Sequence, residues 1–233
     1  MMNLKKRRGG DKMINEFVLT FDVDWAPDYM IEHTVRLLRS YNVKSTWFLT
    51  HESKAINNLL HNDLIEVGIH PNFLPGSTQG ESTIEVMDNL VKAFPMAKVV
   101  RTHAMVYSSE IAKLFCAYHF ERDSSIFLDG MPGIQPYTTH YTDEKSIVRL
   151  PYCWSDDGEL RCRPKWLIPK NEGMKILDFH PVHIFLNTAK KQDYLDYKAI
   201  GTMNLGNRHL TGSEDYLKRI IVYQENFKFL SEL

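Results

Sequence analysis

Two aspartates close the first apolar stretch of the chain. Residues 17–25 (FVLTFDVDW) are rich in β-forming side chains and predict a buried strand, where an ionised group is rarely placed without a partner. In an extended strand Asp22 and Asp24 would point to the same side. Two such carboxylates can bind a divalent cation together, or one can bind the metal while the other acts as a base. They could also cap a helix beginning near Pro27, although a cap needs only one Asp.

Further polar side chains follow the other expected strands. In chain order they are His51, His70 with Asn72, Arg101 with His103, Asp123, Trp154 with Asp156 and Asp157, and His180 with His183. A single histidine at such a place is commonly structural, but several beside paired carboxylates indicate a metal site. One Asp and two His suit Zn²⁺, Co²⁺, Ni²⁺ or Fe²⁺ and leave positions open for water and substrate. Arg101 could pair with Asp22 and keep that carboxylate ionised and oriented.

Strand and helix patterns alternate along most of the chain. Strands are expected at residues 17–25, 43–50, 65–70, 98–104, 120–124, 147–154 and 174–180, helices at 28–40, 53–61, 82–94, 108–119 and 213–233, and a long loop at 125–141. This order predicts a parallel sheet covered by helices, either open or closed into a barrel. The first strand–helix turn lacks the glycine pattern of a dinucleotide site, and a barrel would place its chemistry at the C-terminal strand ends.

The composition fits a globular enzyme. Hydrophobic residues make up 43% and charged residues 24% of the 233 residues, and a net charge of -1 disfavours a general nucleic-acid or anionic-membrane surface. No stretch approaches the roughly 20 apolar residues of a membrane span. We expect a cytoplasmic protein with reduced thiols at Cys116, Cys153 and Cys162. Residues 1–15, which include the basic stretch 5–8, are expected to be a frayed tail, and residues 16–233 one domain.

The ordered motifs resemble the polysaccharide deacetylase superfamily, which are metal-dependent carbohydrate de-N-acetylases built on an irregular seven-stranded (β/α) barrel. The likeness extends from about Phe17 to His183. It rests on TFDVD at 20–24, KSTWFL at 44–49, EVGIH at 66–70, Arg101, RDSS at 122–125 and LDFH at 177–180. HPNF at 70–73 resembles a divergent branch found among surface-polysaccharide biosynthesis proteins.

The resemblance implies a role for each matching residue. Asp22 would be the catalytic base and Arg101 would brace it. Asp24 and His70 would bind the metal, and His180 would be the general acid. His183 is the alternative to His180 as general acid, because both follow the same expected strand.

The third metal ligand departs from the family pattern. The family carries a second histidine four positions after His70, where this chain has Leu74. His103 stands where a proline is expected two places after the bracing arginine, so it could supply the missing imidazole. Asn72 and His51 are the other candidates.

The resulting hypothesis is a metal-dependent hydrolase that removes an N-acyl group, expected to be acetyl, from an amino sugar in cell-surface polysaccharide biosynthesis. The metal is expected to be Zn, with Fe, Co and Ni open, and the sugar could be free, nucleotide-linked or lipid-linked. Asn72, Trp154 and Asp156 are expected to contact the substrate, and Asp156 could instead steer His180. No nucleic-acid partner and no integral membrane segment are expected.

Two alternatives stay open. The same barrel and metal could hydrolyse another C–N bond, such as a cyclic amide, a formamide or a purine-ring amide. A barrel without catalysis could bind a glycan or a partner protein. Retention of Asp22, Asp24, Arg101 and His180 together argues against the second alternative, because a binding module needs neither an acid nor a base.

Overall fold

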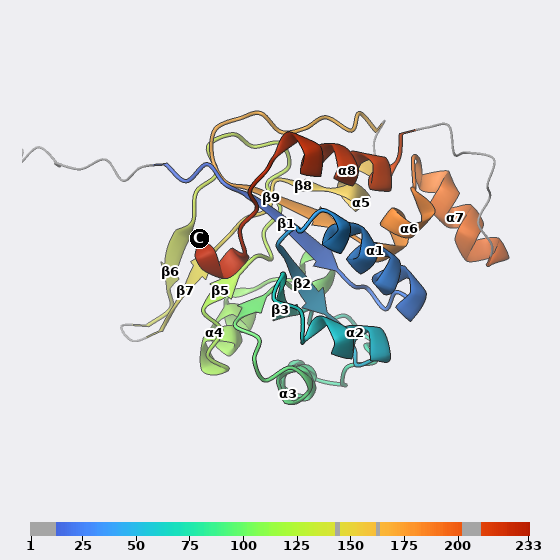
Figure 1. The fold of residues 1–233 in the computed structure, drawn as a ribbon. Coiled ribbons are helices and arrows are strands. Elements are labelled where there is room, and N and C mark those ends of the chain that lie inside the picture. The colour runs from blue at the N-terminus through green and yellow to red at the C-terminus, as the bar shows by residue number, and fades with distance from the viewer. Residues whose placement is uncertain (1–12, 143–144, 162–163, 202–210) are drawn as a thin grey trace, which may run out of the picture.

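The computed structural model describes residues 13–142, 145–161, 164–201 and 211–233. Within these ranges, one sheet contains nine strands in the order β6-β7-β5-β4-β3-β2-β1-β9-β8 (Figure 1). The strands are β1 (Phe17–Asp22), β2 (Ser45–Leu49), β3 (Ile65–Ile69), β4 (Val99–Val100), β5 (Arg122–Asp123), β6 (Tyr137–His140), β7 (Ser146–Arg149), β8 (Trp154–Ser155) and β9 (Lys175–Phe179). Only the β6–β7 pair is antiparallel in this described part. The basic stretch 5–8 and Cys162 lie outside the described residues.

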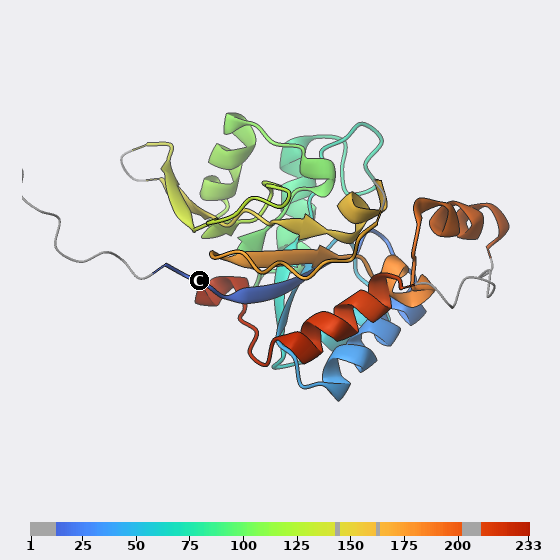
Figure 2. The same ribbon diagram turned by 90° about the horizontal axis from the view of Figure 1, so that it is seen from above.

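Helices surround the outer side of the curled sheet. They are α1 (Asp28–Ser40), α2 (Lys54–Leu59), α3 (Thr83–Ala93), α4 (Ser109–Ala117), α5 (Asp156–Arg161), α6 (Pro181–Leu186), α7 (Lys191–Ile200) and α8 (Ser213–Tyr223), with short 3-10 turns at η1 (His103–Met105) and η3 (Leu230–Glu232). Helices α8, α1, α2, α3 and α4 form an arc around the sheet (Figure 1), and α7 projects away from the body beyond α6 (Figure 2). No helix in the described part is long and apolar enough to cross a membrane.

The expected α/β class is confirmed, but seven strands is the wrong number. The stretch expected as one strand at 147–154 is divided by Pro151, whose nitrogen cannot donate to a ladder. The part before it joins β5 as β7, and the part after it joins β9 as β8. The expected loop at 125–141 also contains β6, and the expected helix 213–233 ends at Tyr223 because the chain then extends to pair Phe227 with Phe17.

The central strands bring their C-terminal ends to one place. β1 lies between β2 and β9, and all six of its residues are buried, which explains its continuous apolar run. Phe21 stacks on Trp47 with ring centroids 4.7 Å apart and lies 5.8 Å from Phe179. The register places Asp22 beside Phe48. Side chains that follow these strands therefore meet above one edge of the sheet.

A glycine in β3 allows two neighbouring strands to approach. A Cβ on Gly68 would lie 2.7 Å from Val99 Cγ2, 2.8 Å from the Val99 carbonyl oxygen and 2.8 Å from Phe48 Cδ1. We expect Gly68→Ala to lower the free energy of unfolding by about 1–3 kcal/mol, because the backbone of β4 cannot move away freely. Denaturant unfolding measures this. Equal stability of the variant and the wild type would show that the sheet relaxes around the methyl group.

Candidate metal centre and active site

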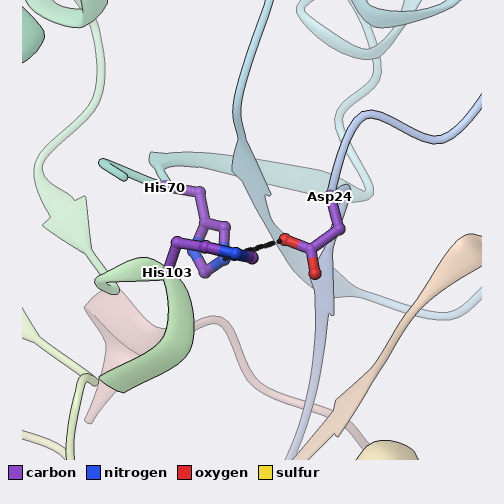
Figure 3. A group of neighbouring side chains, drawn as sticks. All are labelled: Asp24, His70 and His103. Atoms are coloured by element: carbon purple, nitrogen blue, oxygen red, sulfur yellow. Dashed lines mark hydrogen bonds and ion pairs between the residues drawn. The ribbon is translucent and has the colours of Figure 1, made fainter. Parts of the chain in front are cut away.

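Asp24, His70 and His103 meet at one point although they come from three different segments. His70 Nε2 lies 3.2 Å from Asp24 Oδ1, and His103 Nδ1 lies 2.9 Å from the same oxygen. The two imidazole nitrogens are 3.4 Å apart. Figure 3 shows the three side chains pointing toward one another. One carboxylate and two imidazoles converging in this way are a donor set that fits Zn²⁺ or a similar divalent ion.

The hydrogen bonds of His70 leave the correct nitrogen available to a metal. The buried ring places Nδ1 2.8 Å from the carbonyl oxygen of Arg101, which can only accept a hydrogen bond, so Nδ1 carries the hydrogen and donates it. Nε2 is thereby left to face Asp24, an arrangement that orients metal-binding histidines. Burial opposes the charged form of His70, but the carboxylates of Asp22 and Asp24 outweigh burial and raise the pKa of the imidazole. A cation at Nε2 would take the place of that proton.

Asp24 reaches this point through a turn rather than along the strand. β1 ends at Asp22, and both Asp24 (φ 45°) and Trp25 (φ 56°) adopt the left-handed conformation, so the expectation of two adjacent pleats is wrong. Non-glycine residues adopt this conformation only where their surroundings impose it. Here Trp25 N–H donates to Thr50 Oγ1 at 3.3 Å, and the Trp25 ring meets His103 edge-on at 5.3 Å.

The electrostatics of Asp24 favour a cation beside it. Burial disfavours the ionised form, but hydrogen bonds from His103 and His70 outweigh burial and hold the pKa of Asp24 well below its usual value. The carboxylate is therefore ionised at neutral pH. An ionised carboxylate facing two imidazole nitrogens is ready to bind a divalent ion.

Asp22 is held by one oxygen and leaves the other turned toward the metal group. Arg101 Nη1 donates to Asp22 Oδ1 at 3.0 Å, whereas Asp22 Oδ2 lies 3.6 Å from His70 Nε2. Arg101 is itself buried between the rings of Phe48 and Tyr152, with its guanidinium carbon 4.4 Å and 4.5 Å from their centroids. A carboxylate oriented in this way can accept a proton from a water at the metal group.

His180 faces Asp24 from the other side of the site and is held by a buried carboxylate. Asp156 Oδ1 lies 2.7 Å from His180 Nδ1, and Asp156 Oδ2 accepts from the His180 backbone N–H at 2.9 Å and from Ser213 Oγ at 3.2 Å. His180 Nε2 lies 3.6 Å from Asp24 Oδ2. Burial opposes the imidazolium, but Asp156, with Asp178 and Asp24, raises the pKa of His180 well above its usual value. The ring can therefore serve as a proton donor at neutral pH.

A cavity of about 230 Å³ opens over these groups and distinguishes the two candidate acids. Asp22, Asp24, His103 and His180 line it, together with His70. His183 is not among the lining residues. Its buried ring contacts Thr188 Oγ1 at 3.2 Å and Asp157 Oδ1 at 3.5 Å instead. The geometry therefore favours His180 over His183 as the acid.

The three residues expected to contact substrate lie elsewhere. Trp154 is not among the residues that line this cavity. Alternation along β8 turns Ser155 into the cavity and Trp154 to the opposite face, where its ring packs 4.6 Å from Tyr216 and its indole N–H donates to Glu159. Asp156 is fully buried behind His180, so it steers that ring. Asn72 is not among the lining residues, because its side-chain oxygen accepts from the backbone of the following loop at 3.0 Å.

The alternative third ligands are not placed with the metal group. His51 lies at the end of β2 with Nδ1 2.8 Å from Thr50 Oγ1, and neither it nor Asn72 belongs to the cluster of Asp24, His70 and His103. Of the three candidates for the third ligand, His103 is therefore the one that contacts Asp24 Oδ1, the oxygen that His70 also contacts.

Two residues of the site were not predicted from the sequence. Asp178, buried on β9, accepts from Arg101 Nη1 at 2.5 Å, and a carboxylate inside an apolar strand was a signal for it. Gln79 joins the ends of β2 and β3, because its side-chain amide donates to the carbonyl oxygens of Thr50 at 2.9 Å and His70 at 3.0 Å. Nothing in the local sequence around Gln79 indicates this role.

In a second group of possible metal ligands, the carboxylates are already paired with Arg101. Asp22, Asp178 and His180 also lie within 4.8 Å of one another. Arg101 Nη1, however, is bonded to both carboxylates of this group. Because the guanidinium supplies the positive charge there, the metal assignment stays with Asp24, His70 and His103.

Comparisons with known proteins identify the family to which the chain belongs. Residues 19–198 match the family model described as WbmS-like polysaccharide deacetylase. A solved structure from Bordetella bronchiseptica, assigned to the polysaccharide deacetylases and to O-antigen biosynthesis, is similar with 29% identity over 91% of each chain and a TM-score of 0.79. Among curated proteins, none matches the chain.

More distant structures share the fold alone. A structure from Mycobacterium smegmatis assigned to the polysaccharide deacetylases is 16% identical, covers 71% of this chain and 76% of its own, and gives a TM-score of 0.53. A CE4-family pseudoenzyme from Bacillus anthracis is 13% identical, covers 94% and 65%, and gives 0.50.

Proposed function

Because the chain belongs to the WbmS-like polysaccharide deacetylase family, we propose that it is a metal-dependent hydrolase that removes an acetyl group from the nitrogen of an amino sugar. The observation that carries the proposal is the convergence of Asp24, His70 and His103 on one point, with Asp22 and His180 beside it. This combination supplies a cation site, a base and an acid in one cavity. Metal-assisted amide hydrolysis at neutral pH uses all three.

Asp24 Oδ1, His70 Nε2 and His103 Nδ1 would hold the cation, and Zn²⁺ is our first choice because the set contains two imidazoles. Bound there, the cation would polarise the acyl carbonyl and lower the pKa of a water to about 7. The donor set disfavours Mg²⁺ and Ca²⁺, which prefer oxygen ligands. Fe²⁺, Co²⁺ and Ni²⁺ have the same preference for nitrogen and remain the competing ions.

The chain's own groups would move the protons. Asp22 Oδ2 faces the metal group and would accept the proton of the attacking water, while Arg101 holds Oδ1 and prevents the carboxylate from turning. His180 would donate the proton at Nε2 to the departing amine nitrogen. An amide nitrogen leaves poorly without this proton. Asp156 would keep the ring charged and oriented through Nδ1.

The pH profile should report His180. Because its pKa is raised, the imidazolium persists at neutral pH, and activity should fall only as pH rises through that pKa. Asp156→Asn removes the main charge that raises the pKa, so the basic limb of the kcat profile should move to lower pH. His180→Ala should abolish this limb. The assignment would be reversed if the limb survived in His180→Ala and disappeared in His183→Ala.

The family and the similar protein of O-antigen biosynthesis support a proposal for the substrate class. We propose an N-acetylated amino sugar of a surface polysaccharide, processed in the cytoplasm as a free, nucleotide-linked or lipid-linked form. Release of acetate and of a free amino group from each form, with metal supplied, tests this. Release of formate, or opening of a cyclic amide with no acetate from any amino sugar, would indicate the other C–N bonds instead.

A further inference from the structure

One nitrogen of Arg101 contacts more acceptors than it has hydrogens. Nη1 lies 3.0 Å from Asp22 Oδ1, 2.5 Å from Asp178 Oδ1 and 2.8 Å from Thr20 Oγ1. A guanidinium Nη carries two hydrogens. The Thr20 hydroxyl donates its own hydrogen to the carbonyl oxygen of Leu177 at 3.0 Å, so it too accepts from Arg101. Asp22 and Asp178 therefore share a single nitrogen.

The rest of the guanidinium is fixed by other groups. Nε donates to the carbonyl oxygen of Ser124 at 3.1 Å, and Nη2 donates to Ser124 Oγ at 3.0 Å. The rings of Phe48 and Tyr152 cover the guanidinium. Nη1 is the nitrogen that contacts the side on which the base lies.

This sharing decides how Asp22 is held. A guanidinium that faces one carboxylate commonly binds both of its oxygens. Asp178 occupies part of Nη1, so Asp22 is bound through Oδ1 alone and its Oδ2 stays near His70. Burial, followed by the charge of Asp22, raises the pKa of Asp178 well above its usual value.

We propose that Asp178 is a positioning residue: it holds Arg101 in the orientation that leaves one oxygen of Asp22 turned toward the metal group. Its kinetic consequences rest on the proposed deacetylase function. Its structural consequence, the orientation of Arg101 and Asp22, does not.

The kinetic test compares three substitutions of Asp178. Asp178→Ala should lower kcat about 10- to 100-fold, with KM and bound metal within about twofold of wild type, since the base is misplaced but the metal group is untouched. Asp178→Asn keeps an oxygen that accepts from Nη1 and should recover most of kcat. Asp178→Leu fills the same space without an acceptor, so it should show the loss of kcat expected for Asp178→Ala. It provides the test if the alanine variant fails to fold.

A double-mutant cycle separates positioning from general damage. If Asp178 acts through Asp22, then Asp178→Leu should cost less than about twofold when Asp22→Asn is already present. An equal loss in both backgrounds, or wild-type kcat in the leucine and alanine variants, would overturn the proposal.

Crystal structures provide a readout that needs no activity. In Asp178→Leu we expect Arg101 to bind both oxygens of Asp22 and Oδ2 to turn away from His70, whereas Asp178→Asn should keep the wild-type arrangement. Unchanged positions of Arg101 and Asp22 in the leucine variant would overturn the inference. If wild-type protein hydrolyses no acyl sugar, the proposed function fails, and these structures still decide the role of Asp178.

Discussion

Replacing His70 with alanine should lower the affinity for a divalent metal by about tenfold or more and abolish turnover, with the fold retained. The change deletes one of three donors that meet at Asp24, and the remaining two cannot enclose the ion. Asp24→Asn and His103→Ala should have the same effect. Metal analysis after dialysis, with the unfolding midpoint measured in parallel, checks the result.

His51→Ala is the matched control for these variants. His51 follows the neighbouring strand β2, but it lies outside the metal group. This variant should keep its metal. Full metal occupancy in both Asp24→Asn and His70→Ala would refute the site, and full occupancy in His103→Ala alone would refute only the third ligand.

Asp22→Asn should reduce kcat by about 10² or more while leaving the bound metal in place. The substitution keeps the shape of the side chain and an oxygen that can accept from Arg101, but it removes the basic oxygen that faces the metal group. Single-turnover kinetics on metal-loaded protein measure the effect on the chemical step. Loss of the metal in this variant would instead make Asp22 a ligand and exchange the roles assigned to the two carboxylates.

The positions of the site residues along the chain were predictable from local pattern. The turns that bring their side chains together in space were not. The first strand was predicted in the right place, but it ends at Asp22 rather than at residue 25. The left-handed turn at Asp24 and Trp25 was not predictable, because a hydrogen bond to Thr50, which follows the neighbouring strand β2, holds it. His103 likewise does not extend a strand. It begins a 3-10 turn in which Ala104 and Met105 have positive φ values of 53° and 56°.

The sequence does not indicate which way a side chain points where the face of a strand depends on its partners. Trp154 was expected to face the substrate because it ends an apolar stretch, yet the two-residue strand β8 turns its neighbour Ser155 inward. Asp178 is the opposite case, because it was not predicted as a site residue but lies in the site. It lies on the expected last strand, and only the fold shows that the buried Arg101 is its partner. Proline is favoured at the first position of a helix, and α6 begins at Pro181.

In the proposed mechanism, acetyl removal depends on a metal held by this chain. The most direct measurement strips the protein of metal, adds Zn²⁺ in steps, and follows both bound metal and acetate released from an N-acetylated amino sugar. Acetate release should rise in proportion to bound metal, reach its maximum at about one ion per chain, and stay at background in His70→Ala at the same Zn²⁺ concentrations. Equal acetate release from the stripped and the loaded protein, or a fully loaded protein that releases none from any form of the sugar, would rule out a metal-dependent deacetylase.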